Sequence, residues 1–151
     1  MRKTLAFLIV IIICISQLSS CREEIDPRSA LDEFISAYGA EGIIYSPEIP
    51  EGNSGYIPDG LIEKIYVFSG RFPEKYAIFL NSRPEYGYEC GVFICDDADC
   101  LEMMEESCLE RARLLDGGGK RSVVIRSGSV VFYSTMKDKE RAEKIWREII
   151  R

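Results

Sequence analysis

The sequence predicts an α+β domain, in which a mainly antiparallel sheet of about four to six strands packs with two or three helices. Three observations support this fold class. Apolar residues recur at helical spacing in several separate segments, and residues 86–95 alternate like a half-buried strand. Two apolar runs near the C-terminus are joined by the short turn at Ser127 and Gly128. The expected order is therefore helix, three or four strands, helix, hairpin and helix.

The first expected helix begins at Pro27. Asp26 is a suitable N-cap residue, proline is well accommodated in the first helical turn, and Gly39 is a natural residue to end the helix. Apolar side chains recur at helical spacing between these limits, namely Ala30, Leu31, Phe34, Ile35 and Tyr38.

The next segment is less regular. Residues 43–45 favour a short strand, whereas residues 46–60 are rich in Pro, Gly, Asn and Ser, which indicates an exposed loop. The tyrosines in and near this loop can form a binding surface, or they can pack at the sheet edge against their own loop. Residues 61–68 fit neither the helical nor the strand period, so both options stay open there.

Two better-defined strands are expected over 76–80 and 86–95. In the second strand, side chains of alternate residues point to opposite faces. Tyr88, Cys90, Val92 and Ile94 share one face, and Glu89, Gly91, Phe93 and Cys95 share the other.

The C-terminal third predicts helix, hairpin and helix. The acidic residues within 96–99 can cap a helix that runs to about Leu115 and ends before the glycines at 117–119. Residues 122–126 and 130–135 have the pattern of a β-hairpin. A last amphipathic helix is expected over 138–150, with inward residues Ala142, Ile145, Trp146 and Ile149.

The N-terminus carries an export signal. Arg2 and Lys3 precede an unbroken apolar run that is shorter than the ~18–20 residues a helix needs to span a bilayer. Leu18-Ser19-Ser20-Cys21 then resembles the bacterial lipobox, in which an aliphatic residue and two small residues precede the cysteine. We therefore expect a lipoprotein signal peptide over 1–20, cleavage between Ser20 and Cys21, and lipidation of Cys21.

This signal also predicts the organisation and location of the chain. Residues 21–26 form the anchor and a short spacer, and residues 27–151 form a single extracytoplasmic α+β domain of ordinary size. Two or three acyl chains on one residue give stable attachment, so the domain is expected on the extracytoplasmic face of the cell membrane. The alternatives are ordinary secretion, and an uncleaved membrane helix in which Cys21 is an incidental thiol.

Charge and composition exclude several function classes. The chain has a net charge of −6, and loss of Arg2 and Lys3 with the signal peptide takes this to −8. Nucleic-acid binding needs a basic face, so no nucleic-acid partner is expected. Histidine is absent, which removes the commonest general base and the commonest zinc ligand. No catalytic set stands out, and neither an enzymatic activity nor a cofactor is expected.

Four of the six cysteines lie close together in the mature chain, at Cys90, Cys95, Cys100 and Cys108. Outside the cytoplasm such a cluster is more often oxidised than reduced, so these residues are disulfide candidates. Four thiols allow three pairings, and the sequence does not choose among them. Cys95 is close enough in sequence to bridge to Cys100 or Cys108, and such a bridge stabilises by about 2–3 kcal/mol.

Other chemistry at these residues is less well supported. The cysteine spacing lacks the C-x-x-C pair typical of zinc and thioredoxin-like sites, although Cys100 lies near an expected helix N-terminus. The acidic run 96–99 lacks the glycine and closing glutamate of a calcium loop, and helix capping explains it better. Gly117-Gly118-Gly119-Lys120 lacks the spacing of a phosphate-binding loop. No metal site is therefore expected.

From about Tyr38 to the C-terminus the chain resembles a family of small lipoproteins of unknown function from clostridia-like bacteria. The stretches that carry this resemblance are 76–80, 89–95, the helix to Arg111, and 127–131. The resemblance implies a bacterial lipid anchor and an α+β domain, and it implies no activity or site residues.

These observations favour a non-enzymatic lipoprotein that binds an envelope protein or a small ligand. Two alternatives stay open. One is an envelope thiol–disulfide oxidoreductase, or a metal-binding protein, that uses the clustered cysteines. The other is an accessory subunit of an envelope complex.

Overall fold

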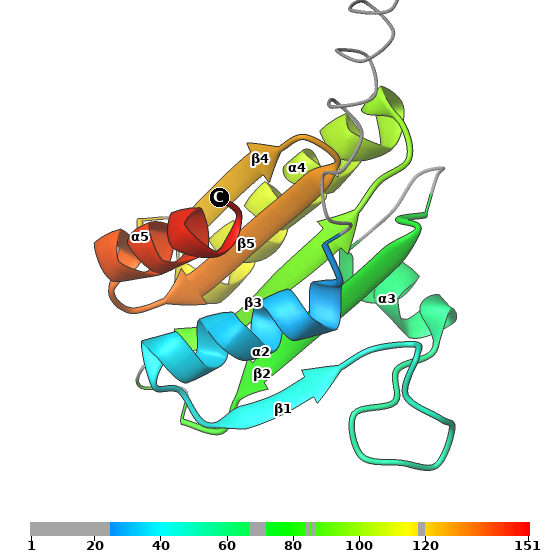
Figure 1. Ribbon diagram of the computed structural model, residues 1–151, viewed down its shortest axis with the longest axis horizontal. Helices are drawn as coiled ribbons and strands as arrows, with labels where there is room; N and C mark the ends of the chain where they lie inside the picture. Colours follow the sequence, from blue (N-terminus) through cyan, green and yellow to red (C-terminus); the bar gives the residue numbers. More distant parts are fainter. Residues whose placement is uncertain (1–24, 67–71, 84, 86, 118–119) are drawn as a thin grey trace, which may run out of the picture.

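The computed structural model describes residues 25–66, 72–83, 85, 87–117 and 120–151. The predicted α+β class is confirmed by a five-stranded sheet with helices in the described part of the chain (Figure 1). The elements in chain order are α2 (Pro27–Tyr38), β1 (Gly42–Tyr45), α3 (Asp59–Tyr66), β2 (Lys75–Asn81), β3 (Gly87–Ile94), α4 (Ala98–Asp116), β4 (Val123–Ser127), β5 (Val130–Met136) and α5 (Lys139–Ile149). The expected signal peptide over 1–20, the expected cleavage after Ser20 and the expected lipidation of Cys21 lie outside the described residues.

The sheet has the strand order β1-β2-β3-β5-β4, and every neighbouring pair is antiparallel. Short connections join β2 to β3 and β4 to β5, and the second of these is a two-residue hairpin turn with Gly128 at φ 60°. The β4–β5 hairpin adds to the sheet through β5, so β4 and β1 form the two edges.

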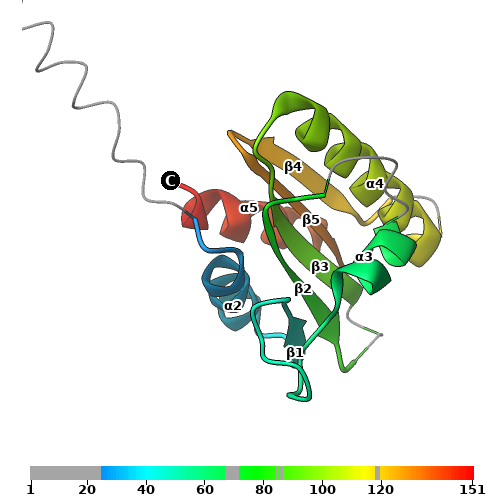
Figure 2. The same cartoon turned by 90° about the vertical axis from the view of Figure 1, so that its right-hand side faces the viewer.

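Helices cover both faces of this sheet. Figure 2 shows the sheet nearly edge-on, with α2 and α5 on one side and α3 and α4 on the other. The alternation predicted for β3 matches this arrangement. Cys90, Val92 and Ile94 lie in the core under α2 and α5, whereas Phe93 and Cys95 lie in the core under α3 and α4. We refer to these as the α2/α5 core and the α3/α4 core.

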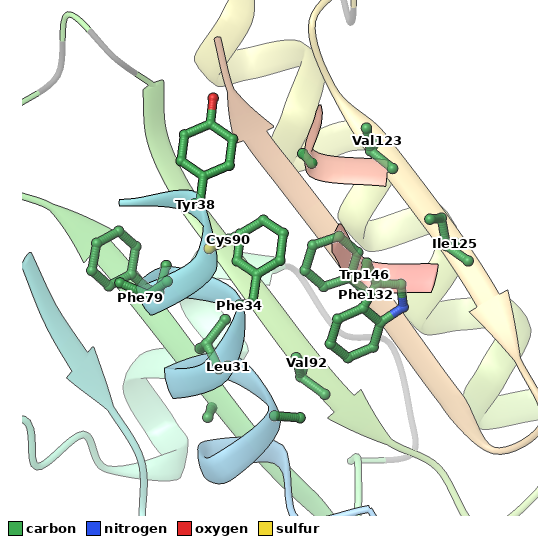
Figure 3. Packing of buried hydrophobic residues seen from close by; sticks show 14 of the residues in the cluster. Leu31, Phe34, Tyr38, Phe79, Cys90, Val92, Val123, Ile125, Phe132 and Trp146 are labelled. Carbon is green, nitrogen blue, oxygen red and sulfur yellow. The ribbon is translucent and has the colours of Figure 1, made fainter. Parts of the chain in front are cut away.

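The α2/α5 core is built around stacked aromatic rings (Figure 3). Trp146 of α5 stacks on Phe132 of β5 with ring centroids 4.2 Å apart, and Phe34 of α2 packs against the same Phe132 at 5.0 Å. Phe132 thus contacts both helices, while α2 lies over β2 and β3 and α5 lies over β5 and β4. The C-terminal end of α2 lies beside the start of α5.

The caps of α2 are those that the sequence predicts. Asp26 accepts a hydrogen bond of 2.8 Å from the backbone N–H of Ser29, and Gly39 ends the helix in the left-handed conformation at φ 76°. The helix therefore stops at Tyr38, which places this tyrosine at the rim of the core.

The segment 61–68, for which the sequence left helix and strand open, is helical as far as it is described. Residues 59–66 form the helix α3, and residues 67–68 lie outside the described residues. Ile62 and Tyr66 are four residues apart and both point into the α3/α4 core, so tertiary packing selects the helix. The preceding loop packs on itself, because Ile49 and Ile57 are buried and Ser46 N–H donates to Gly55 O at 2.9 Å.

Candidate functional site

A cleft of about 450 Å³ lies where the end of α2, the end of β2 and the start of α5 meet. We call it the basic cleft. Its lining residues come from three chain segments and are Tyr38, Gly39, Ala40, Glu41, Asn81, Arg83, Lys137, Asp138 and Arg141. Its volume is in the range of small-molecule sites.

Tyr38 forms the aromatic wall of the basic cleft. Its hydroxyl accepts a hydrogen bond of 3.0 Å from the backbone N–H of Asp138, and Figure 3 shows it pointing away from the packed rings. Desolvation by burial raises the pKa of Tyr38, so the hydroxyl keeps its proton at neutral pH. A neutral hydroxyl that accepts from the backbone still has its own hydrogen to donate to a ligand.

Arg141 lies across this wall. Its guanidinium carbon is 4.9 Å from the centroid of the Tyr38 ring, which is a cation–π distance, and its Nη2 donates to Ala37 O at 3.2 Å. Both contacts join the first turn of α5 to the last turn of α2. The guanidinium is therefore held at the cleft, with donor groups left over, since it carries five N–H bonds.

The charges of the basic cleft are not balanced. Arg83 forms an ion pair of 3.2 Å with Glu41, and the Asp138 carboxylate caps α5 by accepting from Arg141 N–H at 3.0 Å. Among the described residues, Lys137 and Arg141 have no carboxylate within ion-pair distance. The lining therefore has three cations and two carboxylates, which is a net charge of +1 in a chain whose net charge is −6. Lys137 and Arg141 are exposed and lie beside a neutral hydroxyl donor.

A second polar feature, the buried polar cluster of Tyr66, Glu89, Arg111 and Tyr133, lies inside the α3/α4 core. The Glu89 carboxylate is 2 % exposed and accepts from Arg111 through Nε at 2.8 Å and Nη2 at 2.7 Å. Tyr66 donates to the same carboxylate at 3.2 Å, Tyr133 also donates to it, and the two tyrosine hydroxyls are 2.7 Å apart. The buried charge is therefore paired and hydrogen-bonded, as burial requires.

A β-bulge places Glu89 in this position. Tyr88 and Glu89 together lie opposite Thr135, because the register shifts between the pairs Gly87–Met136 and Cys90–Ser134. The Thr135 hydroxyl accepts from Glu89 N–H at 3.0 Å and donates to Glu89 O at 2.9 Å, so it satisfies the displaced backbone.

The buried polar cluster is arranged to stabilise the fold. Arg111, Tyr66 and Tyr133 all donate to the Glu89 carboxylate, so its oxygens are occupied by partners within the protein. Burial, followed by the neighbouring negative groups, raises the pKa of Tyr66 and of Tyr133 well above the usual value, so both stay neutral donors. The hydrogen bonds to Glu89 raise the pKa of Arg111.

The four disulfide candidates are buried, and their sulfurs are not bridged in the structure. Cys90 lies in the α2/α5 core, and Cys95, Cys100 and Cys108 lie in the α3/α4 core. The Cys100 thiol donates to Phe72 O at 3.9 Å, and the Cys100 side chain contributes to the raised pKa of Cys95. Burial raises the pKa of Cys90, Cys95 and Cys108, which disfavours the thiolate that redox catalysis and metal binding need.

In the part of the chain that the structure describes, no group of three or more Cys, Asp or Glu side chains is placed to hold a metal ion. Within the same ranges, no helix has the length and apolar character needed to cross a bilayer.

Sequence reasoning missed the residues of both features. The cations of the basic cleft come from separate segments and have no shared motif, so only the fold brings Arg83, Lys137 and Arg141 together. Glu89 did have a signal, since it is an acidic residue on the face of a strand shared with Phe93 and Cys95.

Comparison of the chain with protein-family models, with curated proteins and with solved structures found no match.

Proposed function

We propose that this protein is a lipid-anchored, extracytoplasmic binding module whose basic cleft binds a small anionic molecule. The lipobox at Leu18–Cys21 and the resemblance to small bacterial lipoproteins support the anchor. The geometry of the basic cleft supports the binding role. The protein is not an enzyme in this proposal.

The observation that carries the proposal is the pair of exposed cations, Lys137 and Arg141, which form no ion pair within the described residues and lie beside the Tyr38 hydroxyl. The cleft is positively charged although the protein as a whole is acidic, and this local positive charge attracts anions. Arg141 can give a carboxylate or phosphate two parallel hydrogen bonds, and Lys137 adds a point charge. Tyr38 adds a hydroxyl donor.

The test uses the full chain, purified from membranes in detergent, and measures thermal unfolding with inorganic phosphate, acetate, succinate or benzoate. Sodium chloride at matched ionic strength controls for general salt effects. We expect at least one probe to raise Tm, since ligand at 100 times Kd stabilises a folded protein by about 2.7 kcal/mol.

Matched variants localise the effect. Lys137→Met and Arg141→Met each remove one cleft cation, and Arg113→Met removes an exposed cation of α4 that lies outside the cleft. We expect the cleft variants to lose the ligand-induced shift, measured against their own ligand-free Tm, and Arg113→Met to retain it. Equal shifts in all three variants, or no shift with any probe, would contradict the proposed site.

The anchor has its own test, which is the intact mass of the protein recovered from membranes. We expect a mass equal to residues 21–151 plus a diacylglyceryl group, with or without a further acyl chain. An uncleaved or unlipidated chain would refute the anchor and leave the basic cleft untouched.

The two rival functions give different results in these experiments. An accessory subunit would co-purify with a stable envelope partner and show no shift with small anions. A thiol–disulfide oxidoreductase needs a reactive thiolate, which a fast-labelling cysteine in the folded protein would reveal.

A further inference from the structure

The position of the sheet limits which cysteines can pair. Cys90 points into the α2/α5 core, whereas Cys95, Cys100 and Cys108 point into the α3/α4 core on the other face of the sheet. Two cysteines whose Cβ atoms point to opposite faces of a sheet cannot be bridged without moving the backbone. Cys90 is therefore excluded from a disulfide with any of the other three.

Helix geometry removes another pairing. Cys100 and Cys108 both belong to α4, and eight residues of helix separate them by about 12 Å along the axis. A disulfide requires Cα atoms within about 7 Å. A bridge can then only join Cys95 to one of the two helix cysteines.

The start of α4 brings Cys100 to Cys95. Cys95 directly follows β3, and its N–H donates to Ser129 O at 2.9 Å, which fixes it to the β4–β5 turn. Asp97 caps α4 by accepting from Cys100 N–H at 2.8 Å, so Cys100 lies in the first helical turn. Cys95 and Cys100 lie in the same core, and the Cys100 side chain is close enough to contribute to the raised pKa of Cys95. Cys108 lies two turns further along α4.

We propose that Cys95 and Cys100 form a disulfide after export, and that Cys90 and Cys108 stay thiols. The oxidant is a disulfide, either of a small molecule or of an envelope thiol oxidase. Each of the two thiols loses its proton, a sulfur–sulfur bond joins Cys95 to Cys100, and the oxidant is reduced to two thiols. This proposal does not depend on what the basic cleft binds.

Burial predicts when this bond forms and how it behaves. Cys95 is 2 % exposed and Cys100 is fully buried. An oxidant can therefore reach these thiols only while α4 is not packed against the sheet. The disulfide therefore forms before the α3/α4 core closes, and in the folded protein it resists reductant. Cys90 and Cys108 are fully buried as well, which protects them from oxidation once the protein has folded.

The test is peptide mapping of the full chain from membranes, alkylated in denaturant before any reduction. Trypsin alone leaves all four cysteines in one peptide, 76–111, because Arg83 precedes a proline. A second protease that cleaves before aspartate separates Cys95 from Cys100. This digestion gives the peptides 76–95 and 99–111, each with two cysteines. We expect the two peptides to be linked, and fragmentation of the linked pair to place the alkyl groups on Cys90 and Cys108.

Two outcomes overturn the proposal: four alkylated thiols without reduction, or a linkage that includes Cys90 or Cys108. A double Cys90→Ala, Cys108→Ala variant gives an independent readout. It keeps the disulfide if the assignment is right, and its mass rises by two hydrogens on reduction in denaturant. Reductant added to the folded wild-type protein without denaturant should not break the disulfide, so the linked peptides should still be found after digestion. Their loss would refute a Cys95–Cys100 disulfide that is buried in the folded protein.

Discussion

Replacing Arg111 by Met tests whether the buried polar cluster stabilises the fold. The substitution keeps an unbranched apolar chain in place of the arginine stem. It removes the guanidinium and with it both hydrogen bonds to the Glu89 carboxylate. Arg113→Met is the matched control, since Arg113 lies on the same helix and pairs with Glu110 at 3.4 Å on the exposed surface.

The expected magnitudes differ several-fold. Removing one partner of a buried ion pair costs about 3–5 kcal/mol, because an uncompensated charge is left inside the protein. Two features favour the lower end of this range: the Arg111 side chain is 25 % exposed, and two tyrosine hydroxyls still donate to Glu89. We expect Arg111→Met to lose about 3 kcal/mol of unfolding free energy, and Arg113→Met to lose at most about 1 kcal/mol.

Denaturant unfolding of the two variants and the wild-type protein measures these losses at equilibrium. The variants Glu89→Gln and Glu89→Gln, Arg111→Met complete a double-mutant cycle. The double variant is expected to lose less unfolding free energy than the sum of the losses in Glu89→Gln and Arg111→Met. If Arg111→Met were no more destabilised than Arg113→Met, Glu89 would not depend on the arginine and the reasoning would be wrong.

Two further predictions concern the same core. Gly91→Ala is expected to cost about 1–3 kcal/mol of unfolding free energy, because its Cβ would lie 2.8 Å from the ring of Tyr133; the control Gly60→Ala, in open space on α3, should be neutral or slightly stabilising by thermal melts. The pKa values of Tyr66 and Tyr133 are raised in the folded protein, so the stability that they contribute is complete below pH about 10 and is lost as the pH rises further. Unfolding free energy should then fall by about 1.4 kcal/mol in total per tyrosine between pH 9 and 11, and Tyr133→Phe should show the shallower slope in denaturant titrations over this range. Parallel slopes in the two proteins would contradict this account.

Local sequence patterns predicted most of the fold. Asp26 and Gly39 mark the ends of α2 within a residue, because capping depends on a few neighbouring atoms. The alternation along β3 placed Phe93 and Cys95 on one face and Val92 on the other, since side chains in a strand alternate. Segment 61–68 stayed ambiguous because burial of Ile62 and Tyr66 against α4, which is distant in sequence, selects the helix.

The sequence by itself determined the acidic character, the absence of histidine and the α+β class, since composition and short-range periodicity suffice for these; the export signal stays a prediction. Only the tertiary structure decided the rest. It brought Tyr38 and Arg141 together across more than a hundred residues, it surrounded Glu89 with donors from three other elements, and it separated Cys90 from the other cysteines. Contacts of this kind depend on how elements pack across the sheet, and packing between distant segments leaves no local pattern in the chain.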